Sequence, residues 1–271
     1  MTGDYVIDGA ATTRTLIRRK ILKGAAVATL MSLLARPSTA ASPTGETGHV
    51  ASPDNAVTGS SSPLSDLKGA DDLSNGYAVS QLILRERLAR ELHDFDVEEA
   101  CFLPDATVEV SWYKGDAAGF IDAGRKSDQR DDPSDAVYFD SMSPPAVWVN
   151  GERALADSSC VVNTFLLLGG VEAALMSYTR LLWRAQKING EWRIAGLRAI
   201  YIRDTLEPCN PVEIPKIDEQ KLKQYRPSYR HLSYVLEAQG RSLRNDLPGV
   251  DRPETVAALR AAERRWLKSM A

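Results

Sequence analysis

The chain reads Lys-Ile-Asn-Gly-Glu-Trp-Arg-Ile at residues 187–194, and this stretch is the strongest fold signal in the sequence. An Asn-Gly pair between two strand-like runs predicts a two-residue type I′ hairpin turn, because both central residues of that turn must accept a positive φ. Asn150-Gly151 repeats the signal. The flanking runs are unusually long, at residues 153–168, 171–188 and 192–203, and the first two meet at Gly169-Gly170. Long antiparallel strands of this kind predict a strongly bent sheet.

Shorter elements precede this meander. Strand patterns occupy residues 107–112, 137–142 and 146–149, and Pro144-Pro145 separates the last two. The apolar side chains of the first helix recur at helical spacing and are expected to face the core: Leu82, Ile83, Leu84, Leu88 and Leu92. A second helix is expected over 97–102, capped by Asp94 or Asp96, and a third over 115–126. Helices followed by a curved antiparallel sheet predict an α+β fold with the helices on one face.

The ends of the chain differ from this middle. Arg18-Arg19 stands before a short apolar run, and Ser38-Thr39-Ala40-Ala41 follows it, which predicts a cleaved twin-arginine-type export signal over residues 1–41. The alternative is a single anchor that is never cleaved. Residues 42–70 are rich in Pro, Gly and Ser and predict a disordered linker. Residues 71–206 form the folded domain, and residues 207–271 form a helical C-terminal extension.

Composition and charge exclude several classes of partner and of site. The net charge is −3, and residues 1–40 contribute +4 through six basic and two acidic side chains, which leaves −7 for the rest. A mildly acidic body argues against nucleic acid or an anionic membrane as partner. Three irregularly spaced cysteines fit neither a disulfide framework nor a zinc site. Cys101 and Cys160 are expected in the core, and Cys209 is expected to be exposed.

Four segments, in their order and spacing, resemble one known family: residues 101–106, 110–115, 147–154 and 189–194. They are similar to the SnoaL-like domain of the nuclear transport factor 2-like superfamily, and the likeness covers about residues 77–206. The resemblance implies a cone of curved antiparallel sheet with N-terminal helices packed on it around a mostly apolar pocket. The tail also resembles an extension found in some members. Because the superfamily includes lyases, isomerases, cyclases and binding proteins, the fold leaves the function open.

The resemblance also implies where acid–base residues lie. Relatives with lyase activity carry an Asp at the end of the first helix and a His on the strand before the hairpin. Here the first position falls on Leu92-His93-Asp94 and the second on Asp140. The two groups thus exchange places, and a reversed His93–Asp140 pair, with Asp94 beside it, would keep the acid–base chemistry without a metal or cofactor. The alternatives stay open that His93 caps its helix and that Asp140 is an ordinary strand carboxylate.

Other side chains are candidates to bind the substrate. Tyr178 and Arg180 share one face of their strand, and Arg180 occupies the place of an arginine that recurs in the family. A structural ion pair is the alternative role for Arg180. The remaining candidates supply hydrogen bonds or aromatic walls: Trp112, Tyr113, Asn163 and Tyr201.

Two functions from different classes remain. The first is an exported, cofactor-free lyase or isomerase, dehydratase-like, that acts on a small apolar or cyclic hydroxy or keto compound. The second is a non-catalytic periplasmic module that binds a small molecule. Either is expected to be periplasmic or secreted, without stable membrane insertion after cleavage. The apolar stripe of the last helix, at residues 256–267, must bury against the domain or a second subunit, and a homodimer is expected.

Overall fold

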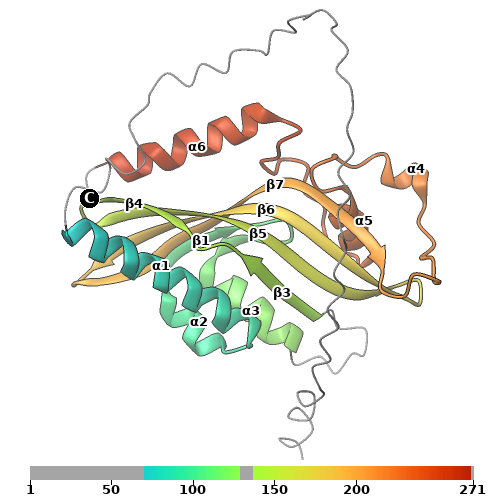
Figure 1. Cartoon of the computed structure of the whole chain (residues 1–271), viewed down its shortest axis with the longest axis horizontal. Helices are drawn as coiled ribbons and strands as arrows, with labels where there is room; N and C mark the ends of the chain where they lie inside the picture. Colours follow the sequence, from blue (N-terminus) through green and yellow to red (C-terminus); the bar gives the residue numbers. More distant parts are fainter. Residues whose placement is uncertain (1–69, 129–136, 270–271) are drawn as a thin grey trace, which may run out of the picture. The chain divides into compact units, whose positions relative to one another are not determined.

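The computed structural model describes residues 70–128 and 137–269. The predicted export signal and nearly all of the predicted linker lie outside these residues. The helices and strands follow the predicted order (Figure 1): α1 Ala70–Glu91, α2 Phe95–Cys101, β1 Phe102–Glu109, β2 Lys114–Asp116, α3 Ala117–Asp128, β3 Val137–Met142, β4 Ala146–Asn150, β5 Arg153–Leu168, β6 Val171–Ile188, β7 Glu191–Pro208, α4 Glu219–Leu222, α5 Arg230–Ala238 and α6 Pro253–Lys268. None of the described helices is long and apolar enough to span a membrane.

A single seven-stranded sheet organises these elements. Its order is β2-β1-β7-β6-β5-β3, and β4 also pairs with β5. The β1–β7 pair is parallel and the other pairs are antiparallel. Two register shifts between β6 and β7, at Tyr178/Thr179 and Arg184/Ala185, bend the sheet as β-bulges do. The predicted α+β class and curved sheet are confirmed.

The hairpin turns differ in type. Asn189 and Gly190 both have positive φ, and so do Gly169 and Gly170, as a type I′ turn requires. At the first predicted turn, Asn150 pairs with Arg153, so the central residues are Gly151 and Glu152. Of these two only Gly151 has a positive φ. The predicted type I′ turn is therefore wrong here, and the pattern fits type II′, which has Gly at its first central position.

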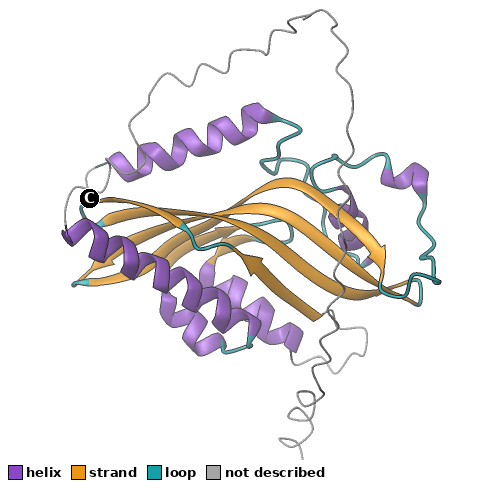
Figure 2. Cartoon of the chain, viewed as in Figure 1, coloured by secondary structure: helices purple, strands orange, loops and turns teal. Residues whose placement is uncertain are grey.

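The sheet has two covered faces. We call the face that carries Cys160, Trp183 and Tyr201 the inner face, and α1–α3 pack against it (Figure 2). The opposite face, with Leu182 and Ile200, is the outer face, and α6 packs there through Val256 and Leu259. The predicted burial of the α6 stripe against the domain is confirmed.

The C-terminal extension contributes to the core of the domain. Tyr229 is 1% exposed and Leu247 2% exposed, and both belong to the main core beside Tyr201. The extension begins with two short helices, α4 and α5, and Pro227, which cannot continue a helix interior, lies between them. Arg252 holds the N-cap position of α6, and the neighbouring Asp251 binds Arg226.

Helix α1 corrects the sequence interpretation most clearly. Leu88 and Leu92, expected in the core, are 55% and 69% exposed. Charged residues of α1 are buried instead: Glu86 at 0%, and Arg87 and Arg90 at 8% exposed. The β1 prediction also shifts, because the strand runs from Phe102 and ends before Trp112.

Candidate functional site

Charged side chains gather under the inner face of the sheet. We call this set the inner ionic cluster: Glu86, Arg87, Arg90, Glu98 and Asp140. Arg87 binds both carboxylate oxygens of Glu86, with Nε 2.7 Å from Oε2, and its Nη1 lies 3.3 Å from Oδ2 of Asp140. The side chains of all five are at most 10% exposed. Buried charges are costly unless they are paired, so this concentration marks the inner face as the candidate site.

The second half of the cluster joins α1 to α2. Arg90 Nη1 donates to Oε1 of Glu98 at 2.8 Å, and its guanidinium carbon lies 3.7 Å from the centre of the Phe120 ring. Glu98 is fully buried, and its Oε2 has no hydrogen-bond partner among the described residues. Burial raises the pKa of Glu98. The charge of Arg90 lowers this pKa in part, and the charge of Glu86 raises it.

The cluster therefore holds one more carboxyl than guanidinium groups. Three carboxyls, of Glu86, Glu98 and Asp140, face the two arginines. Among the three, Glu98 is the carboxyl whose pKa burial raises, and its Oε2 has no hydrogen-bond partner among the described residues. A buried carboxylic acid of this kind is suited to donate a proton.

Two further side chains border Asp140. Tyr138 donates from its hydroxyl to the Arg90 carbonyl at 2.8 Å, and burial raises its pKa to about 12. Burial also raises the pKa of the Cys160 thiol, and the charge of Asp140 adds to the effect. Both groups are neutral at physiological pH, so they add hydrogen-bonding capacity rather than charge.

The predicted His93–Asp140 pair is not among the contacts that the structure describes for Asp140. Asp140 binds Arg87, and its backbone N–H donates to Glu91. His93 lies exposed beyond the end of α1 with a φ of 58°, and its ring stacks near Phe95 at 5.7 Å and near Tyr138 at 6.2 Å. The pairing therefore stays a prediction.

Asp94 has a local structural contact. Its carboxylate accepts from the backbone N–H of Val97 at 3.3 Å and caps α2, as the helix prediction expected.

Three of the predicted binding residues lie at or near the inner face. Tyr201 is 3% exposed and packs edge-on against Tyr229. Burial raises the pKa of Tyr201 to about 12. Trp112 stacks on Phe120 at 5.1 Å, and Tyr113 donates from its hydroxyl to the Asp116 carbonyl.

The other three predicted binding residues lie on the outer face, because strand register puts Cys160 and Thr179 on the inner one. Arg180 Nε donates to Asp157 at 2.8 Å, so it has the structural ion pair that was its alternative role. Tyr178 is 37% exposed. The Asn163 amide donates to the Phe139 carbonyl and to Oγ of Ser141.

Sequence reasoning missed Glu86, Arg87, Arg90 and Glu98. A signal for two of them exists, since Val79, Ile83, Glu86 and Arg90 follow one another at spacings of four, three and four. Charges that continue a buried apolar stripe are themselves buried. No comparable spacing marks Glu98, which lies in the short helix α2.

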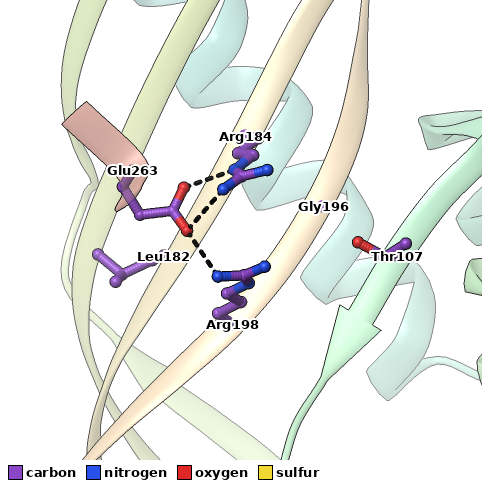
Figure 3. A pocket seen from close by; sticks show the side chains of 6 residues that line it. All are labelled: Thr107, Leu182, Arg184, Gly196, Arg198 and Glu263. Atoms are coloured by element: carbon purple, nitrogen blue, oxygen red, sulfur yellow. Dashed lines mark hydrogen bonds and ion pairs between the residues drawn. The ribbon is translucent and has the colours of Figure 1, made fainter. Parts of the chain in front are cut away.

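A narrow cleft lies on the outer face, where α6 meets the sheet (Figure 3). The Glu263 carboxylate forms ion pairs with Nε of Arg184 at 2.6 Å and with Nη1 of Arg198 at 3.3 Å. The space between the lining residues does not admit a water-sized sphere. These contacts attach α6 to the sheet and leave no room for a ligand. Within residues 70–128 and 137–269, no group of His, Cys, Asp and Glu is arranged to hold a metal ion.

Comparisons with known proteins agree with this architecture. Residues 71–198 match the family model described as a SnoaL-like domain. Pea pathogenicity protein 2 of the fungus Fusarium vanettenii is 30% identical over 183 residues, which cover 65% of this chain and 77% of that protein. An uncharacterized protein of Emericella nidulans is 26% identical over 59% of this chain and 69% of its own length.

Solved structures are similar at lower identity. An NTF2-like protein with a cystatin-like fold from Novosphingobium aromaticivorans is 19% identical and covers 49% of this chain and 90% of its own, with a TM-score of 0.36. A conserved protein from Planctomyces limnophilus is 16% identical over 50% and 98%, with a TM-score of 0.38.

Proposed function

Because the chain belongs to the SnoaL-like domain family, we propose that it binds a small cyclic hydroxy or keto compound at the inner face and eliminates water from it or isomerises it. The observation that carries this proposal is the inner ionic cluster, in which Oε2 of the fully buried Glu98 has no hydrogen-bond partner among the described residues. Neighbouring carboxyls in different protonation states are the pattern of an acid–base site.

The two carboxyls have complementary roles in this chemistry. Asp140 takes a proton from the carbon beside a carbonyl, and the C–H electron pair forms the new double bond. In an elimination, Glu98 gives its proton to the departing hydroxyl, which leaves as water with the C–O electron pair. After the elimination Asp140 passes its proton to solvent and Glu98 is reprotonated. In an isomerisation Asp140 returns the same proton to another carbon of the substrate, so the site is restored directly, and neither reaction needs a cofactor.

A non-catalytic binding module is the second candidate. The specific observation in its favour is that Arg87 already donates a hydrogen bond to the Asp140 carboxylate. One oxygen of this carboxylate already accepts from a guanidinium, so it is less available to a substrate. In this function the cluster fixes the walls of a binding site, and the ligand leaves unchanged.

A ligand screen followed by an exchange assay separates the two functions. Cyclic hydroxy and keto compounds that raise the melting temperature are ligands, since binding to the folded state stabilises it. Each keto ligand is then followed by NMR in deuterium oxide, where proton abstraction replaces the α-hydrogens. We expect Glu98→Gln and Asp140→Asn to lower turnover or exchange by about 10²–10⁴-fold.

Control variants complete the test. Arg193→Gln, in an exposed ion pair with Glu191, is expected to keep full activity. His93→Ala tests the sequence-predicted pair in the same assay. Ligands that bind without any turnover or exchange would replace the enzyme proposal with the binding module.

We also propose that residues 1–41 direct export. Two observations bear on it: the basic pair with its short apolar run supports export, whereas the relatives at hand are fungal and give the bacterial twin-arginine route no support. Mass spectrometry of the protein from its producing cells should find a new N-terminus near Ala41. An intact Met1 in the membrane fraction would show an uncleaved anchor instead.

A further inference from the structure

The segment between α5 and α6 lies against the edge of the candidate site. Residues 241–246 form neither helix nor strand, and Gly240, with a φ of 70°, ends α5 just before them. Arg244 donates to Oε1 of Glu109 at 2.7 Å and to the Val110 carbonyl at 3.4 Å. Side chains, not a backbone ladder, therefore hold this part of the segment to β1.

Trp112 links the segment to the inner ionic cluster. The guanidinium carbon of Arg241 lies 5.4 Å from the centre of the indole, and that of Arg90 lies 5.7 Å from it. The same indole stacks on Phe120, which Arg90 also covers. One side chain thus separates residue 241 from the arginine that holds Glu98.

The far end of the segment is fixed. Arg226 Nη1 donates to the carbonyls of Leu247 at 2.8 Å and Asn245 at 3.0 Å, and the backbone N–H of Tyr201 donates to the Pro248 carbonyl at 2.9 Å. Leu247 is itself part of the core. The segment therefore has a rigid base, a glycine at its other end, and a charged contact to β1 between them.

We propose that residues 241–246 are a lid over the inner ionic cluster and that the Arg244–Glu109 contact is its latch. When the latch opens, residues 242–244 lift from β1 while both ends of the segment stay fixed, and the Arg241 guanidinium leaves Trp112, so a small molecule gains entry to the inner face. The lid itself does not depend on the proposed function, and only the identity of the compound that enters rests on it. A latch made of partly exposed charges, Arg244 at 15% and Glu109 at 26%, is weakened by salt.

Native thiols report the opening without any ligand. Cys101 and Cys160 are 3% and 2% exposed in the core beside the cluster, whereas Cys209 is exposed. In the full chain carrying Cys209→Ser, the rate of labelling by 5,5′-dithiobis(2-nitrobenzoate) is measured and each site is identified by mass spectrometry. We expect Arg244→Ala to speed labelling by roughly tenfold, because it removes hydrogen bonds between charged groups. Arg244→Lys should restore most of the slow rate.

A stability-matched control excludes global unfolding as the cause. Leu259→Ala lies on α6 at the outer face and lowers stability without touching the segment. Faster labelling in Arg244→Ala alone, and a salt-dependent rate in the parent that this variant loses, support the lid. Equal acceleration in Leu259→Ala, or none in Arg244→Ala, overturns it. If labelling follows the expectation while no compound binds, the lid stands and the proposed function fails.

Discussion

Arg87 is the residue on which the inner ionic cluster depends most. It contacts Glu86 and Asp140, whose side chains are 0% and 4% exposed. Removing one partner of a buried ion pair leaves a charge without compensation in a poorly solvated place. The cost of such a change is much larger than the worth of the pair itself.

Arg87→Met should therefore lower the free energy of unfolding by about 3–5 kcal/mol, measured by urea denaturation with circular dichroism. Arg125→Met is the matched control, since Arg125 contacts Asp96 and Glu99, which are 89% and 61% exposed. Its loss should cost far less than the loss of Arg87, because exposed ion pairs contribute little to stability. Similar losses in both variants would contradict the burial of the Arg87 pairs.

At the scale of elements, α1 has an unusual distribution of side chains. It turns charged residues toward the sheet and exposes four large apolar ones at helical spacing: Leu73 at 59%, Tyr77 at 69%, Leu88 at 55% and Leu92 at 69%. We call these four residues the α1 stripe. Because they recur along one face of the helix, an antiparallel second copy would bury Leu73 against Leu92 and Tyr77 against Leu88.

If the chain forms the homodimer that the sequence predicts and the α1 stripe is its interface, Leu88→Gln with Leu92→Gln should abolish self-association and change the stability of the monomer by no more than about 0.5 kcal/mol. Analytical ultracentrifugation measures the mass, which we expect to fall from a dimer to a monomer. Leu167→Gln is the control, because Leu167 is 49% exposed on β5, away from α1. Dissociation by Leu167→Gln alone would move the interface to the sheet, and a monomeric parent would end the homodimer proposal.

Helix α6 makes a separate contribution. Leu259 is 7% exposed and packs on Leu182 and Ile200, so Leu259→Ala should cost about 2–5 kcal/mol in urea denaturation. Val250→Ala, at a side chain that is 51% exposed, should cost less than about 0.5 kcal/mol. Equal effects would mean that α6 is not attached to the outer face.

The sequence predicts these elements with unequal success, for physical reasons. The long strands β5–β7 carry their own turn signals, so local chemistry suffices to place them. The orientation of α1 depends on which face meets the sheet: Ile83 is buried as predicted, but the leucine pattern also included Leu88 and Leu92, which are exposed. For the site, the family resemblance points to Asp140 but not to its partner Arg87, which lies 53 residues away in the chain. Contacts at that separation follow from the sheet, not from local pattern.

At the scale of the whole molecule, acid should loosen the C-terminal extension. Hydrogen bonds from Arg226 lower the pKa of Asp251, and those from Arg244 lower the pKa of Asp246. A carboxyl with a lowered pKa in the folded state stabilises fully above its unfolded value of 3.8, and this contribution is lost as the pH falls through the folded value.

Asp251→Asn should therefore lower the urea midpoint at pH 7 by an amount equivalent to about 1–3 kcal/mol, and the difference from the parent should shrink below pH ~3.8. Asp246→Asn is the control, since Asp246 is 64% exposed and its loss should cost less. A difference that stays constant down to pH 2 would contradict the role of the Arg226–Asp251 pair.

The burial of Tyr229 and Leu247 beside Tyr201 also bears on the order in which the protein is made. A ribosome that has finished β7 at Pro208 has still to add 39 residues (247 − 208) before Leu247 is made. At ~5–20 residues per second this takes roughly 2–8 s, during which Tyr201 lacks its full cover. The nascent chain therefore spends seconds with an open core that no earlier segment closes, and holding it soluble for that time is a task for chaperones.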